Sequence, residues 1–254
     1  MEKKEDLAFI KKRLVELSRR SFEQGICLFS DFLDASGIRA FDEIRQSLYP
    51  CGFRVNGGFP DAERVMIGFG TEGSSEDEVH FPIEFLKASP VAPKYSEELT
   101  HRDYLGALMN LGIDRSRVGD LIVKENEALI ICEESLSDFI ISELSRVRHT
   151  EIIIKKIDHF PEEFLPKREL CEGTISSLRL DALLGRALNI SRGRASDLIT
   201  SGMVFINGRE KREVSYSPKN DDRISVRGFG KLRFLEAFGE TKKSRLKVSW
   251  ERYV

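Results

Sequence analysis

The sequence has few cysteines and histidines, and none of them is spaced for a metal site or a disulfide framework. The four cysteines, Cys27, Cys51, Cys132 and Cys171, form no C-x-x-C pair. The four histidines do not complete a set of ligands at the spacing of a zinc site. We therefore expect reduced, structural thiols and no metal.

Long apolar runs are also missing. No stretch approaches the roughly 18 apolar residues that a membrane-spanning helix needs. The start of the chain, MEKKEDLAFIKKRL, is charged and amphipathic, unlike the apolar region of a signal peptide. The chain also has no G-x-x-x-x-G-K-[ST] phosphate loop. These absences predict a cytoplasmic protein with no membrane partner and no cofactor.

The formal net charge of −2 hides a division of charge along the chain. Residues 175–254 contain 17 Lys and Arg against 9 Asp and Glu, a net charge of +8. Residues 1–174 contain 23 basic and 33 acidic residues, a net charge of −10. A length of 254 residues favours two or three domains. The basic end is the part expected to meet a nucleic acid.

The stretch Leu178–Arg212 contains the strongest local signals. Leucines at 180, 183, 184 and 188 recur at helical spacing, and Ser191 is placed to cap a second helix that ends at Gly202. Asn207-Gly208 is a strong turn signal. It predicts a hairpin in which residues 203–206 lead back toward residues 224–226. The predicted unit is two helices followed by a β-hairpin.

Positive charge gathers in this same stretch. Arg192 and Arg194 fall in the first turn of the second helix, where the macrodipole disfavours cations, and such a conflict is expected at a functional site. Amides and guanidinium groups at a helix start can bind phosphate. The candidate binding residues are Arg179, Ser191, Arg192, Arg194, Arg209, Lys211 and Arg212. The alternative interpretation is a solvated basic face.

The phosphate-binding interpretation carries two expectations about side chains. Arg192 and Arg194 should point toward phosphate rather than toward the core, so that replacing both leaves the fold intact. Leu198 should be buried, so that truncating it destabilises the protein.

The first 174 residues are predicted to form two more domains. A helix at 3–20, a strand at 26–32, a helix at 38–48 and strands at 53–55 and 65–69 around Gly57-Gly58 give a small α+β domain. A polar linker at 71–78 follows. Residues 80–157 then read β-α-β-β-α-β, with strands at 80–86, 120–124, 128–132 and 151–157 and helices at 97–111 and 136–147. This is the order of a ferredoxin-like sandwich.

The fold class expected for the whole chain is α+β. Residues 158–172 are predicted to be a linker, and further strands after Gly228-Phe229-Gly230 should extend the sheet of the C-terminal module. The predicted domains are residues 1–72, 78–158 and 175–254.

Three other clusters could carry chemistry, and each has a simpler structural interpretation. Gly57 and Gly58 could let the backbone approach a ligand, but a hairpin turn is favoured. Asp31 and Asp34 could act as general acid and base, but no histidine or metal ligand accompanies them. The triplet His101-Arg102-Asp103 resembles a kinase loop without its companion motifs, and a helix-capping cluster after Thr100 is favoured.

The basic stretch resembles the RNA-binding domain of the ribosomal protein S-four type. The similar residues are Arg179-Leu180-Asp181, Ser191-Arg192, Ala195, Leu198-Ile199, Gly202, Val204 and Asn207-Gly208. The resemblance implies that structured RNA binds to the two helices and to the basic residues after the hairpin turn. It assigns this role to Arg179, Arg192, Arg194 and Lys211.

Over nearly its whole length, the chain resembles the YlmH family of bacterial ribosome-associated proteins. The similar stretches are Phe29–Asp34, Gly57–Arg64, Thr100–Gly106, Leu111–Asp120 and Arg179–Gly208. The resemblance implies a non-enzymatic factor that binds the large ribosomal subunit and assists quality control of stalled nascent chains. The implied partners are ribosomal RNA and tRNA or peptidyl-tRNA.

The alternative is an RNA-modifying enzyme with an appended S-four-type domain. A pseudouridine synthase would need its catalytic aspartate in a large sheet domain, whereas Asp181 lies in the binding module itself. A methyltransferase would need a glycine-rich cofactor loop after a strand, and the sequence has none. A free-standing RNA-binding protein of the heat-shock type would leave the first 174 residues unexplained. We expect a monomeric binding factor with no catalytic residue.

Overall fold

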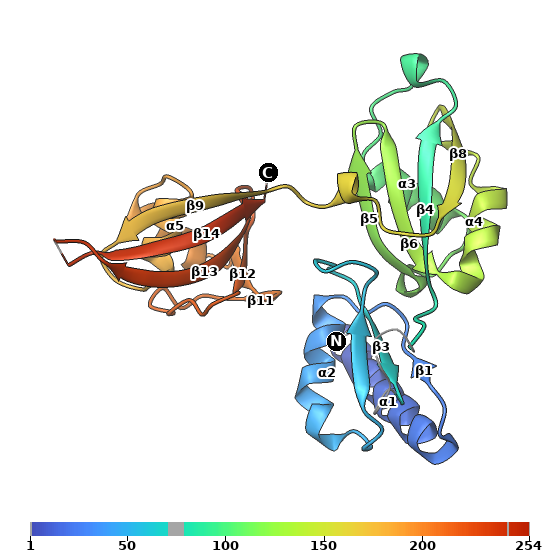
Figure 1. Cartoon of the computed structure of the whole chain (residues 1–254), viewed down its shortest axis with the longest axis horizontal. Helices are drawn as coiled ribbons and strands as arrows, with labels where there is room; N and C mark the ends of the chain where they lie inside the picture. Colours follow the sequence, from blue (N-terminus) through green and yellow to red (C-terminus); the bar gives the residue numbers. More distant parts are fainter. Residues whose placement is uncertain (1, 71–78, 243, 254) are drawn as a thin grey trace. The chain divides into compact units, whose positions relative to one another are not determined.

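The computed structural model describes residues 2–70, 79–242 and 244–253. The chain divides into two compact units, residues 1–164 and 165–254, and Figure 1 shows their helices and strands in sequence colours. Both units combine helices with antiparallel sheets, so the predicted α+β class is confirmed. The second unit begins ten residues before the basic segment counted from the sequence. The added residues 165–174 contain two basic and two acidic residues, so the net charge of the unit is also +8.

The first unit begins with two helices beside a three-stranded sheet of order β1-β3-β2 (Figure 1). The elements are α1 (Glu2–Gln24), β1 (Leu28–Phe29), α2 (Ala35–Ile44), the 3-10 turn η1 (Arg45–Ser47), β2 (Phe53–Asn56) and β3 (Met66–Phe69). Leu14 and Leu17, which share one face of α1, are 1% and 4% exposed. They share a core cluster with Phe41 and Phe69.

The strand predicted over residues 26–32 is shorter than expected. Leu28 and Phe29 pair with β3 as a regular strand. Beyond them, the amide of Ser30 donates to the carbonyl of Ile67, and Leu33 forms an isolated bridge with Val65. The amide of Phe32 donates instead to the carbonyl of Ser116, 2.8 Å away in the next part of the chain. The polar linker predicted at residues 71–78 lies outside the described residues.

The rest of the first unit is a five-stranded antiparallel sheet with two helices. The elements are β4 (Ile83–Pro90), η3 (Pro93–Tyr95), α3 (His101–Asn110), η4 (Arg115–Arg117), β5 (Val118–Lys124), β6 (Glu127–Glu133), η5 (Glu134–Leu136), α4 (Ser137–Glu143), β7 (Arg146–Val147), β8 (Thr150–Ile157) and η6 (Glu162–Phe164). The strand order is β5-β6-β4-β8-β7. The predicted helix over 136–147 ends at Glu143, because Arg146 and Val147 pair with β8 as the strand β7.

Side chains of β6 point alternately to the two faces of this sheet, and they are buried on both faces. Ala128, Ile130 and Cys132 are fully buried in a cluster with residues of α3 and α4. Leu129 and Ile131 are also fully buried, on the opposite face, in a cluster with Phe32, Met66 and other apolar residues. The three-stranded and five-stranded sheets therefore share a core.

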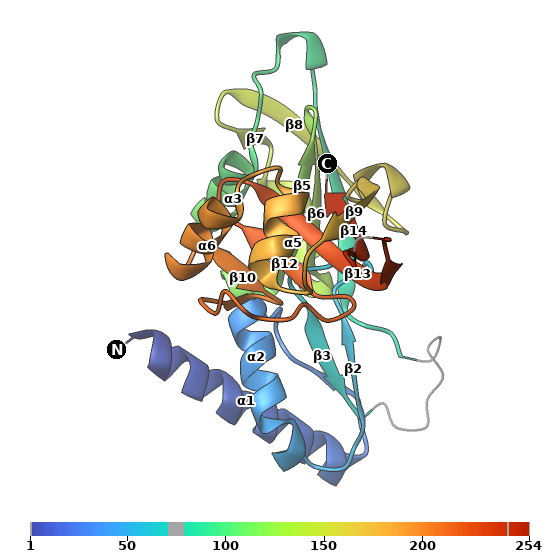
Figure 2. The same cartoon turned by 90° about the vertical axis from the view of Figure 1, so that its left-hand side faces the viewer.

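The second unit is a six-stranded sheet with both of its helices on one face, as Figure 2 shows. The elements are β9 (Arg168–Ile175), α5 (Leu180–Ala187), α6 (Arg192–Thr200), β10 (Val204–Ile206), β11 (Arg209–Glu210), β12 (Arg223–Val226), β13 (Gly230–Glu240) and β14 (Leu246–Tyr253). The order is β11-β10-β12-β13-β14-β9. The helix residues Leu183, Leu184 and Ile199 are buried in a cluster with strand residues such as Ile224 and Trp250.

The linker predicted over residues 158–172 is wrong from Arg168 onward. These residues instead begin β9, the first strand of the second unit. β9 pairs with the last strand, β14, from Arg168 opposite Tyr253 to Ile175 opposite Leu246. Charged and apolar residues alternate only weakly in β9, so its sequence does not predict a strand. The strand forms because these residues pair with β14.

The hairpin turn predicted at Asn207-Gly208 is present. Both residues have left-handed backbone angles, with φ of 49° and 74°, as a type I′ turn requires. The turn leads directly into β11, and β12 pairs with β10 on its other side. The predicted pairing of residues 203–206 with 224–226 is therefore correct, but β11 is inserted between these segments along the chain. No helix in the described residues is long and apolar enough to cross a membrane.

We predict that β9 is needed for the stability of the second unit. A fragment of residues 165–254 should fold, whereas a fragment of residues 175–254 should lose about 2 kcal/mol or more and melt roughly 8–16 °C lower. Trp250, the single tryptophan, lies in this core and reports unfolding by its fluorescence. Equal melting temperatures for the two fragments would show that β9 is dispensable.

Candidate nucleic-acid interface

The candidate basic residues lie around the starts of α5 and α6. Arg179 is the N-cap of α5, with extended backbone angles, and Ser191 is the N-cap of α6. The Ser191 hydroxyl accepts a hydrogen bond from the amide of Arg194 at 3.2 Å. Asn189 has a φ of 53°, which turns the chain between the helices. The capping role of Ser191 predicted from the sequence is confirmed.

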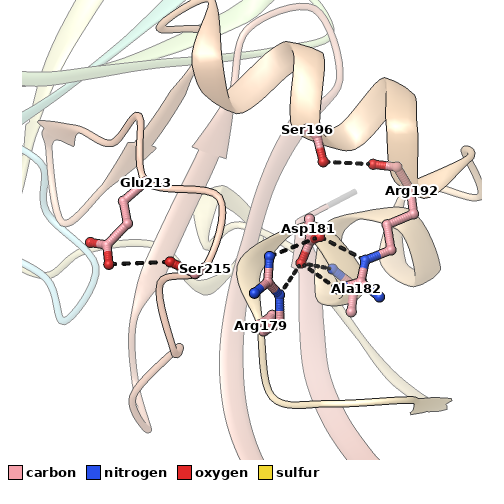
Figure 3. Close-up of polar contacts among 7 residues, drawn as sticks. All are labelled: Arg179, Asp181, Ala182, Arg192, Ser196, Glu213 and Ser215. Carbon is pink, nitrogen blue, oxygen red and sulfur yellow. Dashed lines mark hydrogen bonds and ion pairs between the residues drawn. The ribbon is translucent and has the colours of Figure 1, made fainter.

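A buried carboxylate joins the two helix starts (Figure 3). Asp181, only 3% exposed, lies in the first turn of α5. Its Oδ2 accepts from Arg192 Nε at 2.6 Å, and its Oδ1 accepts from Arg179 Nε at 3.1 Å and from the Ala182 amide at 2.9 Å. Burial opposes the charge, but hydrogen bonds from Arg192 and Arg179 hold the pKa of the Asp181 carboxyl below its usual value.

This ion pair corrects the orientation predicted for Arg192. Its guanidinium is bound to Asp181 through two nitrogens and does not simply point toward solvent. The side chain is still half exposed, at 49%. Arg179, 37% exposed, is held by the same carboxylate. The expectation that Arg192 can be removed without effect on the fold is therefore not supported, because a buried carboxylate would lose one of its two cations.

Arg194 fits the expectation better. It is exposed, it has no acidic partner among the described residues, and its guanidinium lies 5.7 Å from the centroid of the Phe229 ring. Leu198, which was expected to be buried, is only partly buried beside the core, whereas Ile199 and Ala195 are fully buried. Helical spacing identified the correct face of α6, but Ile199 rather than Leu198 lies at the centre of that face.

The basic residues after the hairpin turn separate into two places. Lys211 forms an ion pair with Glu213 at 3.1 Å and lies 4.1 Å from the centroid of the Tyr216 ring. The carbonyl of Tyr216 accepts from the amide of Leu180, so this lysine belongs to the start of α5. Arg212 pairs with Glu210 beside Gly202, at the end of α6. Arg209 is exposed on β11 and has no acidic partner among the described residues.

Gly202 is required where the prediction placed a helix stop. Its φ is +75°, and a Cβ there would lie 2.7 Å from the carboxylate of Glu210. The positive φ is what requires glycine, because the Glu210 carboxylate is the end of a flexible side chain and can move.

A second polar cluster joins the two parts of the first unit. Arg64 donates from Nε to the carbonyl of Val118 at 2.9 Å, and from Nη2 to the carbonyls of Phe32 at 2.9 Å and Arg115 at 3.0 Å. The amide of Glu63 donates to Asp120 Oδ2 at 2.6 Å. Three stretches that carry the YlmH resemblance, residues 29–34, 57–64 and 111–120, therefore meet at one place.

Asp120 and His101 are the titratable groups of this cluster. Burial raises the pKa of the Asp120 carboxyl to about 6, although Arg64, Arg115 and His101 oppose the shift. Burial and the nearby Arg115 lower the pKa of the His101 imidazole. His101 begins α3, so the fourth stretch, residues 100–106, also reaches this cluster.

The other clusters have structural roles. Asp34 caps α2 and accepts from the amides of Ser36 and Gly37, both at 2.9 Å. Asp103 Oδ2 accepts from the amide and the hydroxyl of Thr100, as the capping interpretation predicted. The loop at Gly57-Gly58 is not a tight hairpin, since β2 and β3 are nine residues apart and Arg64 within this connection is bound to the other sheet. Among the described residues, no group of metal-binding side chains is present.

A comparison with protein families indicates a class of domain within the chain. Residues 78–160, which contain the five-stranded sheet, match the family described as "Putative RNA-binding domain in YlmH". The chain therefore contains a domain of an RNA-binding class.

Over its full length, the chain is also similar to a known protein. It is 29% identical over 255 residues to "Ribosome-associated protein quality control protein P2" of Bacillus subtilis (strain 168), covering 98% of this chain and 96% of that protein. The domain match and this similarity confirm the resemblance to the YlmH family. A solved structure, "Cell division protein ylmH from Streptococcus pneumoniae", aligns with 59% of this chain and 89% of that chain, with a TM-score of 0.46 and 14% identity.

We predict that Arg192 and Arg194 differ in their effect on stability. Each variant, Arg192→Ala or Arg194→Ala, removes one cation from the first turn of α6. Only Arg192→Ala takes a partner from buried Asp181 and should lower the melting temperature of the second unit by about 4–8 °C. Trp250 fluorescence during thermal unfolding of the full chain measures the difference. Equal melting temperatures would show that the ion pair is not stabilising.

The pH dependence of that difference follows from the sign of the shift. The pKa of Asp181 is lower in the folded state, so the stabilisation is present above the unfolded pKa of about 3.9 and is lost as pH falls through the folded value. The melting temperatures of wild type and Arg192→Ala should therefore converge in acid. A difference that persists after Asp181 is protonated would exclude the ion pair as its cause.

We predict the opposite pH dependence for Asp120. Its folded pKa of about 6 lies above the unfolded value, so the stability it contributes is present below about pH 4 and is lost as pH rises through 6. Asp120→Asn should therefore stabilise the first unit by about 1–3 kcal/mol at pH 8 and have little effect at pH 4. Hydrogen exchange of residues 57–70 and 115–124 measures this. Asp158→Asn, in an exposed loop, is the control, and a destabilised Asp120→Asn at pH 8 would contradict the prediction.

Proposed function

We propose that this protein is a non-enzymatic RNA-binding factor that binds the large ribosomal subunit and tRNA. It would act as a cytoplasmic monomer in the rescue and quality control of stalled nascent chains. The observation that carries the proposal is the similarity to the Bacillus subtilis quality control protein, which extends over 98% of this chain.

The electrostatics of the second unit support RNA as the ligand. This unit carries the net positive charge of the chain, and its net charge of +8 is suited to a phosphate backbone. At the start of α6, Arg194 is exposed and has no acidic partner among the described residues. Arg209 on β11 is a second such cation. Phosphate contacts from these two arginines would leave the ion pair of Asp181 intact.

The arrangement of strands supports the finer fold assignments that we propose. In the first unit, β4 pairs antiparallel with β6 and β8, and β5 pairs with β6, which is the order of a split β-α-β sandwich. We therefore assign residues 83–157 to the ferredoxin-like class. Two helices followed by a type I′ hairpin support the S-four-type assignment of residues 179–208.

The position of Asp181 favours binding over catalysis. This aspartate gives the module its superficial likeness to the catalytic motif of a pseudouridine synthase. Its carboxylate is buried and bound by two arginines, so it is occupied in holding α5 against α6. Mass spectrometry of ribosomal and transfer RNA from cells with and without the protein tests the enzyme alternative. One lost modification, restored by the wild-type gene, would contradict the proposed function.

The direct test is crosslinking of the full chain to ribosomes followed by sequencing of the attached RNA. We expect crosslinks to RNA of the large subunit and to tRNA. Crosslinks confined to messenger RNA or to the small subunit would contradict the proposal.

We predict that Arg194→Ala weakens cosedimentation with large subunits about tenfold or more, because it removes one charge-assisted contact with phosphate. Arg252→Ala is the matched control. It removes the same charge from the same unit, but Arg252 already pairs with Glu169 at 2.6 Å. A loss that is equal in both variants would show that only the net charge matters, and no loss in either would place the RNA contact elsewhere.

A further inference from the structure

Three aromatic rings outside the core of the second unit lie beside arginines. One is Tyr253, whose neighbour Arg168 also pairs with Glu251. The other two lie beside arginines that have no acidic partner among the described residues. The first is Phe205, the middle residue of β10. Its neighbours Val204 and Ile206 are 0% and 6% exposed and point into the core, so Phe205 lies on the opposite face of the sheet, away from α5 and α6. The guanidinium of Arg227 lies 4.9 Å from the centroid of its ring.

The second ring is Phe229, in the turn between β12 and β13. It is 38% exposed, and the guanidinium of Arg194 lies 5.7 Å from its centroid. This contact brings the turn to the start of α6, where the candidate phosphate-binding residues lie. A hydrogen bond from the Phe229 amide to the carbonyl of Val226, at 3.0 Å, fixes the turn.

The turn of residues 227–229 connects the two pairs, because it contributes one member to each. The amide of Arg227 donates to the carbonyl of Met203 at 2.9 Å, which holds the turn against the start of β10. Gly228 between the two residues has a φ of +81°. We call Phe205, Arg227, Phe229 and Arg194 the stacking surface.

The partners of these arginines distinguish them from others in the unit. Arg233 pairs with Asp221 and Glu251, Arg252 with Glu169, and Arg212 with Glu210. Arg194 and Arg227 have no acidic partner among the described residues and lie over rings instead. Their positive charge is therefore not neutralised, and their guanidinium groups lie over aromatic rings.

This combination of groups suits an unpaired nucleobase. Aromatic rings and guanidinium planes stack on the face of any base, and uncompensated arginines attract the adjoining phosphates. In an A-form duplex the base faces are stacked on one another and cannot be reached. We infer that the stacking surface binds unpaired bases of RNA, in a loop or a single-stranded end. The inference rests on the proposed function and specifies the kind of RNA that this function would use.

The test compares two RNA probes with the full-length protein. One is a hairpin with 2-aminopurine among the unpaired adenines of its loop, and the other is a blunt duplex of the same length. Phe205→Ala and Phe229→Ala should each weaken binding of the looped hairpin about tenfold and reduce the fluorescence change of the loop. Binding of the duplex and the salt dependence of binding should not change, because no phosphate contact is removed.

Matched variants separate stacking from charge and from folding. Phe238→Ala removes an exposed phenylalanine, 45% exposed on β13, for which no arginine contact exists among the described residues, and should bind like wild type. Phe229→Trp should restore binding because it keeps an aromatic face. Arg227→Lys keeps the charge without the guanidinium plane and should weaken hairpin binding more than duplex binding. Trp250 fluorescence confirms that the variants with a single tryptophan are folded, and circular dichroism does so for Phe229→Trp.

Each outcome decides between defined alternatives. Hairpin binding by Phe205→Ala and Phe229→Ala that equals that of wild type would overturn the inference, as would an equal loss for hairpin and duplex. Loss of ribosome cosedimentation with unchanged binding of the free hairpin would assign the surface to a protein partner and also overturn it. If wild type binds neither probe and does not cosediment with ribosomes, the proposed function itself fails.

Discussion

The buried carboxylate of Asp181 is the interaction on which the candidate interface depends. One acid, 3% exposed, holds arginines from the starts of two helices, and its second partner lies eleven residues along the chain. Because an unpaired buried charge is costly, the two helix starts are fixed relative to each other. Arg192 is therefore partly structural. Arg194, two residues later, is not held by any acid in the described part of the chain and can serve a ligand.

The first unit has a comparable constraint at a different place. Arg64 donates to three backbone carbonyls from the segments around Phe32, Arg115 and Val118. The carbonyls of Val118 and Arg115 also accept from the Arg115 side chain and from the Val118 amide. A planar guanidinium can reach several carbonyls at once, so Arg64 ties these segments together. The stretches that carry the YlmH resemblance converge here. Their shared role in this structure is to join the two parts of the first unit, with Asp120 and His101 at the same junction.

The second unit shows two uses of arginine. Where a carboxylate lies within reach, as at Arg233 and Arg252, the charge is neutralised on the surface of the sheet. Arg194 and Arg227 instead lie over aromatic rings and have no acidic partner among the described residues, so their charge persists. Arg168 has both a ring, Tyr253, and an acid, Glu251. A net charge counted from the sequence does not separate these groups. Only the second group combines attraction for phosphate with a flat surface.

The sequence by itself determined the features that depend on neighbours along the chain. Helical spacing placed the buried face of α5, Ser191 and Gly202 marked the ends of α6, and Asn207-Gly208 marked the type I′ turn, because capping and turn geometry are set within a few residues. The tertiary structure decided the rest. It made a strand of residues 168–172, bound Arg192 to Asp181, placed Ile199 rather than Leu198 at the centre of the core, and set Phe205 and Phe229 beside arginines. Each of these depends on which distant segment lies opposite, and local patterns of charge and hydrophobicity do not encode that partner.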